Sequence, residues 1–288
     1  MAKKPLRKKK KFPKIDLSKV NIYQVIYVGC IVTSILLLVG LAVMLLFPDD
    51  GIPEIEIPTY VETEATTGET EDTAGTGPEG TEPAETKPRE MLPKMKALYE
   101  QNPDVIGWIN IPDTKVDYPV MYTPTDPEKY LYANFKGKFS IAGMPFIDAH
   151  CSMEPESDNL LIYAHNMNNG TMFQNIMKYE NKKFWQQHPL IYFSTLYEER
   201  TYEVVYAFED KIYDADVDVF KFYKFIDAGS EEEFDEAMAY FAKKSTYDTG
   251  VKATYGDNLI TLVTCAYHTS NGRFVVVARQ VTPEPNNE

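Results

Sequence analysis

The chain has 288 residues, of which 44% are hydrophobic and 25% are charged. Its charge is unevenly spread. Residues 1–24 hold nine basic residues and one acidic residue (net +8), residues 25–47 hold no charge, and residues 48–90 hold thirteen acidic and two basic residues (net −11). Residues 91–288 also carry −11, from 29 acidic and 18 basic side chains. An acidic body repels phosphate, and the basic block adjoins an apolar run, so a nucleic-acid binder and a purely soluble cytosolic protein are both disfavoured.

The 23 residues from Val25 to Phe47 predict a single transmembrane signal-anchor, because about 20 apolar residues span a bilayer as a helix. A secretory signal peptide has a shorter apolar core and a small-residue cleavage site, whereas Pro48 and Asp49 follow this run directly. Basic flanks stay in the cytoplasm. We therefore expect residues 1–24 to form a basic cytoplasmic tail and the bulk of the chain to lie outside the cell membrane.

Residues 48–90 are rich in Thr, Glu, Pro and Gly and poor in large apolar side chains. Such a composition buries too little surface to offset chain entropy, and its negative charge is self-repelling. It predicts a disordered linker that holds a folded domain, residues 91–288, away from the membrane. The linker and the span thus divide the chain into a tail, an anchor, a tether and one domain.

The domain predicts a mainly β fold, a closed barrel of about eight strands with an N-terminal helix and two inserted helices. The expected helices are Met91–Gln101, Thr171–Tyr179 and Ser230–Lys244, and in the last of these Ser230 and Glu233 have capping-box spacing. The expected strands are Val105–Ile111, Val116–Tyr122, Met144–Asp148, Asn159–His165, Leu190–Thr195, Thr201–Phe208, Asn258–Thr264 and Arg273–Val281.

The last two expected strands form a hairpin that predicts a chemical site. One strand ends in the thiol of Cys265, and the other begins with Arg273 after a seven-residue loop, so the two side chains can lie side by side. A cation there would favour a thiolate or bind a developing oxyanion. Arg279 lies six residues further on, roughly 20 Å along the strand at ~3.3 Å per residue, and is expected to be solvated or paired with a carboxylate.

A catalytic thiol needs a base, and the chain offers four histidines. His165 ends an expected strand and His268 lies three residues after Cys265, so from the residues alone they are rival bases. His150 and His188 are interpreted as structural. No His, Cys and carboxylate cluster has the spacing of metal ligands, and no cofactor is required. A bridge between Cys151 and Cys265 is an alternative to a free thiol, while Cys30 falls in the apolar span.

Several segments resemble the sortase family, and particularly its class B branch. They are Thr261–Cys265 (TLVTC) with Arg273 eight residues later, Tyr163–Met167 (YAHNM), Asn102–Ile109 (NPDVIGWI), Val116–Val120 (VDYPV) and the helix at 230–244 before the cysteine strand. The resemblance covers about residues 91–281. The chain departs from the family pattern at Ala164, where Gly is frequent, and at Val263, where many class B members have Ser.

The resemblance implies a sortase-type barrel and a cysteine transpeptidase on the outer face of a Gram-positive-type membrane. It implies Cys265 as nucleophile, His165 as general acid and base, and Arg273 as the cation that orients substrate and stabilises the oxyanion. Tyr163, Thr264 and the backbone N–H of Ala266 are the candidate substrate-binding groups. The implied partners are sorting-signal peptides of surface proteins and a peptidoglycan precursor or another amine.

Three interpretations of the sequence stay open. The first is a class B enzyme that anchors surface proteins to the cell wall through a thioester acyl-enzyme. The second is the same chemistry used to polymerise pilin subunits, with a Lys side chain as acceptor. The third is a non-enzymatic anchored barrel in which Cys265 is inert. A papain-type hydrolase is disfavoured because His165 precedes Cys265, the reverse of the order in those chains.

Overall fold

A computed structural model describes Tyr27, residues 30–38 and residues 89–281. By internal contacts the chain divides into two units, Met1–Asp49 and Asp50–Glu288. In the first unit residues 30–38 are helical. Among the residues described, none of the helices has both the length and the apolar character needed to cross a membrane. The predicted tail, most of the predicted span and nearly all of the predicted linker fall outside the described residues.

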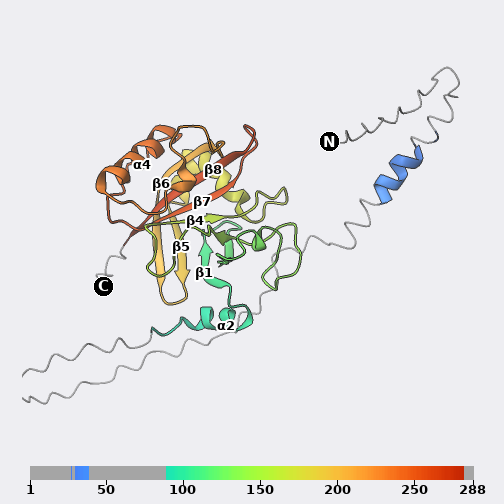
Figure 1. Cartoon of the computed structure of the whole chain (residues 1–288), viewed down its shortest axis with the longest axis horizontal. Coiled ribbons are helices and arrows are strands. Elements are labelled where there is room, and N and C mark those ends of the chain that lie inside the picture. Colours follow the sequence, from blue (N-terminus) through green and yellow to red (C-terminus); the bar gives the residue numbers. More distant parts are fainter. Residues whose placement is uncertain (1–26, 28–29, 39–88, 282–288) are drawn as a thin grey trace, which may run out of the picture. The chain divides into compact units, whose positions relative to one another are not determined.

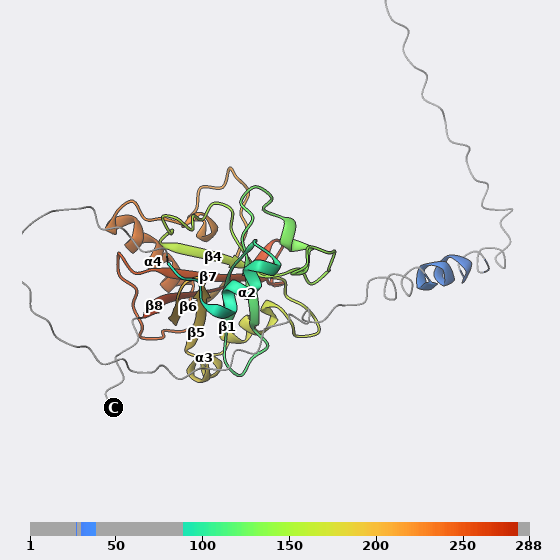
Figure 2. The ribbon, with the colours of Figure 1, turned by 90° about the horizontal axis from the view of Figure 1, so that it is seen from below.

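In the second unit eight strands close into a barrel, which confirms the predicted fold class for the domain (Figure 1, Figure 2). The strand order around it is β1-β2-β3-β4-β7-β8-β6-β5, and β5 pairs back onto β1. The β2–β3 and β4–β7 pairs are parallel, and the others are antiparallel. The strands are β1 (Val105–Asn110), β2 (Asp117–Met121), β3 (Phe146–Ile147), β4 (Asn159–Tyr163), β5 (Leu190–Thr195), β6 (Glu199–Lys211), β7 (Leu259–Cys265) and β8 (Gly272–Val281).

The two faces of β7 and β8 pack into different clusters, since successive side chains of a strand point to opposite faces. Leu262 and Val276 belong to the cluster that fills the barrel. Val263 and Val275 belong to a second cluster, which includes apolar side chains of α4 (Glu231–Lys244) outside the barrel. Because both faces are buried, the sequence of these strands is a nearly continuous apolar run rather than an alternation.

The helix α4 begins as its sequence predicts. The Ser230 side chain accepts a hydrogen bond from the Glu233 N–H (3.3 Å), and the Glu233 carboxylate accepts one from the Gly229 N–H (2.8 Å). The remaining helices are α2 (Pro93–Gln101), α3 (Lys182–Gln187) and the 3-10 helices η2 (Lys129–Leu131), η3 (Phe173–Glu180) and η4 (Phe222–Lys224). The helix predicted at 171–179 is therefore a 3-10 helix.

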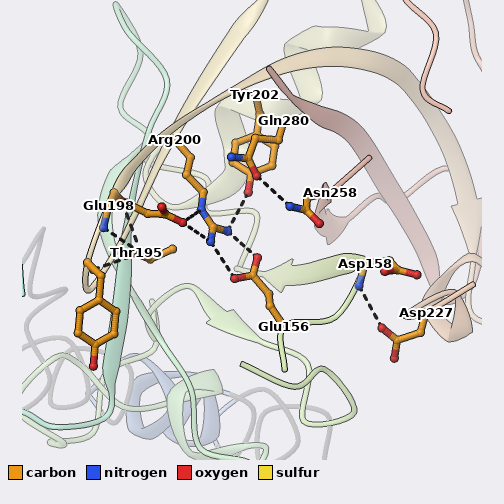
Figure 3. A network of polar contacts seen from close by, with 10 residues as sticks. Glu156, Asp158, Thr195, Glu198, Arg200, Tyr202, Asp227, Asn258 and Gln280 are labelled. Atoms are coloured by element: carbon orange, nitrogen blue, oxygen red, sulfur yellow. Dashed lines mark hydrogen bonds and ion pairs between the residues drawn. The ribbon is translucent and has the colours of Figure 1, made fainter. Parts of the chain in front are cut away.

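The loop between β3 and β4, residues 148–158, is held by an ion pair to β6 and by a hydrogen bond to the segment before α4 (Figure 3). Arg200 on β6 donates two hydrogen bonds to the Glu156 carboxylate, one of them 2.9 Å long, and a third of 2.7 Å to Glu198. The Asp158 N–H donates to the Asp227 carboxylate (3.0 Å). Both contacts fix the far end of a loop whose first residues face the site described below.

Replacing Arg200 with methionine is expected to lower the free energy of unfolding by about 3 kcal/mol, because removing one partner of a largely buried ion pair strands the other charge. The Arg200 side chain is only 9% exposed. Urea unfolding followed by circular dichroism measures this change. The matched control is Arg279→Met, since the Arg279 side chain is 31% exposed and pairs with Glu203. That variant is expected to lose less than about 1 kcal/mol. Equal losses of unfolding free energy in the two variants would contradict the larger stabilising effect expected of Arg200.

Candidate active site

Three neighbouring strands of the barrel bring the predicted thiol, imidazole and guanidinium together. Cys265 at the end of β7 is the cross-strand partner of Arg273 on β8. On the other side β4 runs parallel to β7 with Tyr163 paired to Val263, so two more residues bring His165 level with Cys265. The three side chains line one cavity of about 340 Å³. The convergence expected from distant parts of the sequence is therefore present.

The cavity opens on the outer face of the barrel. Cys265 and Arg273 share the strand parity of Val263 and Val275, which pack in the outer cluster, whereas Leu262 faces the barrel interior. The reactive side chains thus project where the ordered ladder of β7 and β8 ends. A peptide can reach them there without entering the packed core.

The imidazole of His165 has a defined orientation. Its Nε2 lies 2.8 Å from the backbone carbonyl of Leu131, in η2. A carbonyl only accepts hydrogen bonds, so Nε2 carries a proton and Nδ1 is left as the nitrogen that can accept one. The ring also contacts that of Tyr132, with centroids 5.6 Å apart. The η2 segment thereby orients the His165 imidazole, which belongs to a different part of the chain.

Two side-chain hydrogen bonds join the residues around His165 to the residues around Cys265. The Asn166 amide donates to the carbonyl of Cys265 (2.9 Å), and the Thr264 hydroxyl donates to the carbonyl of Ala164 (2.8 Å). These two bonds connect β4 to β7 at the point where both strands end. Asn166 was not predicted as a site residue; its position directly after His165 is the only signal the sequence offers.

The loop between β7 and β8 is joined next to Arg273 by hydrogen bonds to the Gly272 carbonyl. Arg273 donates from one guanidinium nitrogen to the carbonyl of Gly272 (2.9 Å), and the same carbonyl accepts the N–H of Ala266 (3.0 Å). A Cβ on Gly272 would lie 2.3 Å from the Ala266 carbonyl oxygen, so only glycine fits. The N–H of Ala266 is thus already engaged, and Ala266 is buried, so this geometry does not fit its predicted role as a substrate-binding group.

The other two candidate substrate-binding residues, Tyr163 and Thr264, line the cavity. The Tyr163 ring stacks on Phe146 with centroids 5.8 Å apart. Burial, and next the negative charge of Asp148, raises the pKa of Tyr163 well above its usual value. Tyr163 therefore stays protonated.

The structure separates the rival histidines. His268 lies in the β7–β8 loop outside the cavity lining, with Nδ1 3.4 Å from the Glu209 carboxylate. His188 has a structural partner, since its Nδ1 lies 3.0 Å from the carbonyl of Pro112 and must therefore carry the proton. His150, interpreted from sequence as structural, is also among the residues that line the cavity.

Of the two rival bases, only His165 is expected to be needed for activity. His268→Ala should retain most peptide cleavage, because its imidazole does not line the cavity, whereas His165→Ala should lose at least about 100-fold, the lower range for a general acid or base. Initial rates of cleavage of a fluorescent sorting peptide measure both. An inactive His268→Ala beside an active His165→Ala would reverse the assignment.

All three cysteines are among the described residues, and each is a free thiol, so the bridge between Cys151 and Cys265 is absent. Cys151 is 2% exposed, and burial raises the pKa of its thiol to about 12. Cys265 is partly exposed in the cavity. No group of His, Cys, Asp and Glu side chains in the described part of the chain is arranged to hold a metal ion.

These thiols are expected to differ sharply in reactivity, since a buried, protonated thiol is inert and an accessible one is not. In a Cys30→Ser background, a methanethiosulfonate reagent should modify one thiol per folded chain, Cys265. Mass spectrometry of tryptic peptides identifies the site. Labelling of Cys151 alone, or of neither thiol, would support the inert interpretation of Cys265.

A β-barrel with a cysteine, a histidine and an arginine around one outward-facing cavity has the components of a cysteine transpeptidase. The family model described as the sortase domain matches residues 109–281, and the chain therefore belongs to the sortase family. Its relatives place it in class B, as the sequence motifs indicate.

Two relatives are sortase B of Listeria monocytogenes, 29% identical over 203 residues (67% of this chain and 76% of the relative), and sortase B of Staphylococcus aureus, 27% identical over 189 residues (65% and 74%). Among solved structures, the S. aureus sortase B–substrate complex matches with a TM-score of 0.60 at 26% identity, over 68% of this chain and 88% of that one. A Bacillus anthracis protein similar to sortase B matches with a TM-score of 0.60 at 30% identity, over 69% and 87%.

Proposed function

We propose that this chain is a membrane-anchored class B sortase that cleaves a C-terminal sorting signal of surface proteins and transfers them to an amine of the cell wall. The observation that carries the proposal is the shared cavity of Cys265, His165 and Arg273. Each side chain supplies one function that acyl transfer needs: a nucleophile, a proton carrier and a cation for the oxyanion.

In the first half-reaction the thiol proton of Cys265 passes to Nδ1 of His165, and the sulfur attacks a backbone carbonyl of the sorting signal. A carbon–sulfur bond forms, and the carbonyl oxygen gains the negative charge that the guanidinium of Arg273 stabilises. His165 then donates a proton to the nitrogen of the scissile amide, the carbon–nitrogen bond breaks, and the C-terminal fragment leaves as an amine. The product is a thioester between the surface protein and the enzyme.

In the second half-reaction an acceptor amine attacks the thioester carbonyl. The tetrahedral intermediate again places its negative oxygen near Arg273, His165 takes a proton from the attacking nitrogen, and the sulfur of Cys265 leaves. A new amide joins the surface protein to the acceptor. Relatives support both substrates: the solved structures of sortase B include a substrate complex and a complex with triglycine.

The sequence supports the membrane anchor. The uncharged run at 25–47 follows nine basic residues, which favours a cytoplasmic N-terminus and an extracellular catalytic domain. The acidic, Thr- and Glu-rich residues 48–90 would then serve as the tether between membrane and barrel. Protease digestion of intact cells and of inside-out vesicles tests this orientation, since only intact cells should expose the barrel.

The experiment that tests the enzymatic proposal incubates the purified protein with a panel of sorting peptides, each with and without an acceptor amine. We expect one peptide class to be cleaved, a thioester to be trapped at Cys265, and an amide product to form when triglycine or a peptidoglycan stem peptide is present. Transfer only to a pilin-type Lys side chain would instead favour subunit polymerisation. Cleavage of none of the peptides, with no thioester, would favour the binding barrel.

A further inference from the structure

The second half-reaction has one more proton to remove than a single histidine accepts. An aliphatic acceptor with an ordinary pKa of ~8–10 arrives as an ammonium with three N–H bonds, and the amide that forms keeps one. The first proton must leave before the nitrogen can attack, and the second leaves as the amide forms. His165 handles the second, by the reverse of the step in which it protonates the leaving amine. The first proton must go to another acceptor, either water or a second side chain.

A second imidazole lies in the same cavity. The His150 Nδ1 is 2.7 Å from the Asp148 carboxylate, and the His150 side chain is 85% exposed. A carboxylate on Nδ1 fixes the tautomer that leaves Nε2 as a free base. Both His150 and His165 line the cavity with Cys265.

Backbone hydrogen bonds of residues 148–151 fix the positions of His150 and Asp148. The His150 N–H donates to the Asp148 carboxylate (2.9 Å), the Cys151 N–H donates to the Asp148 carbonyl (3.0 Å), and the Tyr122 hydroxyl donates to the Cys151 carbonyl. Further along the loop, Glu156 is clamped by Arg200. The exposed His150 ring therefore belongs to a turn that is stabilised by its own hydrogen bonds.

We propose that His150, oriented by Asp148, accepts the first proton of the acceptor ammonium and passes it to solvent. The nitrogen–hydrogen bond breaks, its electron pair becomes the nucleophile, and the proton moves to Nε2 of His150 and then to water. His165 accepts the second proton after attack on the thioester. The inference rests on the proposed function and assigns His150 to its second half-reaction. Glu128 also lines the cavity, but its carboxylate belongs to a weaker class of base than imidazole.

The test uses the full chain and compares two acceptors on the same thioester: triglycine, which is largely an ammonium at neutral pH, and hydroxylamine, which is already uncharged. His150→Gln is expected to lower the transfer rate to triglycine by roughly tenfold to a hundredfold, the low end of general-base effects because water also accepts protons. Transfer to hydroxylamine should change less than about twofold, because no first proton has to leave. The matched control is His188→Gln, an imidazole hydrogen-bonded to Pro112 away from the cavity.

Two outcomes would overturn the inference. Transfer to triglycine in His150→Gln could equal that of the His188→Gln control, or transfer to hydroxylamine could fall as much as transfer to triglycine, which would indicate a positional role in a shared step. A second variant, Asp148→Asn, should reproduce the selective loss for triglycine if Asp148 orients the ring. Failure of the proposed function is distinguishable, because the wild-type protein would then form no thioester with any peptide.

Discussion

Replacing Cys265 with alanine should abolish both thioester formation and peptide cleavage while the barrel stays folded. The loss is expected to be at least about 10⁴-fold, the scale on which peptidases respond when their nucleophile is removed. The fold should persist because Cys265 is partly exposed at a strand end, so little buried apolar surface is lost. Mass spectrometry detects the acyl-enzyme, and chromatography quantifies the cleaved peptide.

Cys151→Ala is the matched control for this variant. Its thiol is buried and donates a hydrogen bond to the Asn159 carbonyl (3.5 Å), so its removal affects packing but not the cavity chemistry. That variant is expected to keep the thioester and to lose some stability. Wild-type cleavage by Cys265→Ala would reject the enzymatic proposal.

The second large effect is expected from Arg273→Lys, although the positive charge is kept. Arg273 uses one guanidinium nitrogen on the Gly272 carbonyl, which orients the plane and leaves its other donors for the substrate oxygen. An ammonium lacks this planar fork and cannot make both contacts in fixed directions. Loss of an oxyanion donor typically costs about 10²–10³ in kcat, and we expect the same here. Steady-state kinetics that separate kcat from KM measure it.

Arg279→Lys provides the comparison on the same strand. Arg279 pairs with Glu203 (3.2 Å) and lies within 4.0 Å of Asp257, as expected for an arginine with a structural role. Its replacement should leave the kinetics near those of the wild type. Wild-type turnover in Arg273→Lys would show that a positive charge alone suffices and that the fork has no role.

The positions of the strands were predicted well from the sequence, and the ends of several strands less well. The Leu190–Thr195 strand has the predicted bounds, whereas β3 is two residues long instead of five and β6 extends to Lys211. Pairing with a neighbour decides such ends: β6 runs alongside β8 as far as Lys211 opposite Gly272, a partner that is distant in the sequence. The short helix α3 carries no apolar periodicity and was missed.

At the site, the hairpin geometry of Cys265 and Arg273 could be predicted because a short loop makes it local. The choice of His165 over His268 could not be derived from spacing, since it depends on the parallel β4–β7 pair. The position of His150 in the lining of the cavity could not be predicted from spacing for a related reason. Its place in the cavity follows from β3 packing beside β4, and no pattern in the sequence around it records that neighbour.

The strand order of the barrel has a consequence for biosynthesis. Both β7 and β8 come last in the sequence, yet they lie between β4 and β6, so each of those strands has an open edge until residues 259–281 are made. Cys265 and Arg273 lie on these same two strands, which pair with β4 and β6. A nascent chain that lacks β7 and β8 has no strands between β4 and β6 and does not yet contain Cys265. Synthesis of residues 259–281 therefore completes the sheet and supplies Cys265 and Arg273 in the same step.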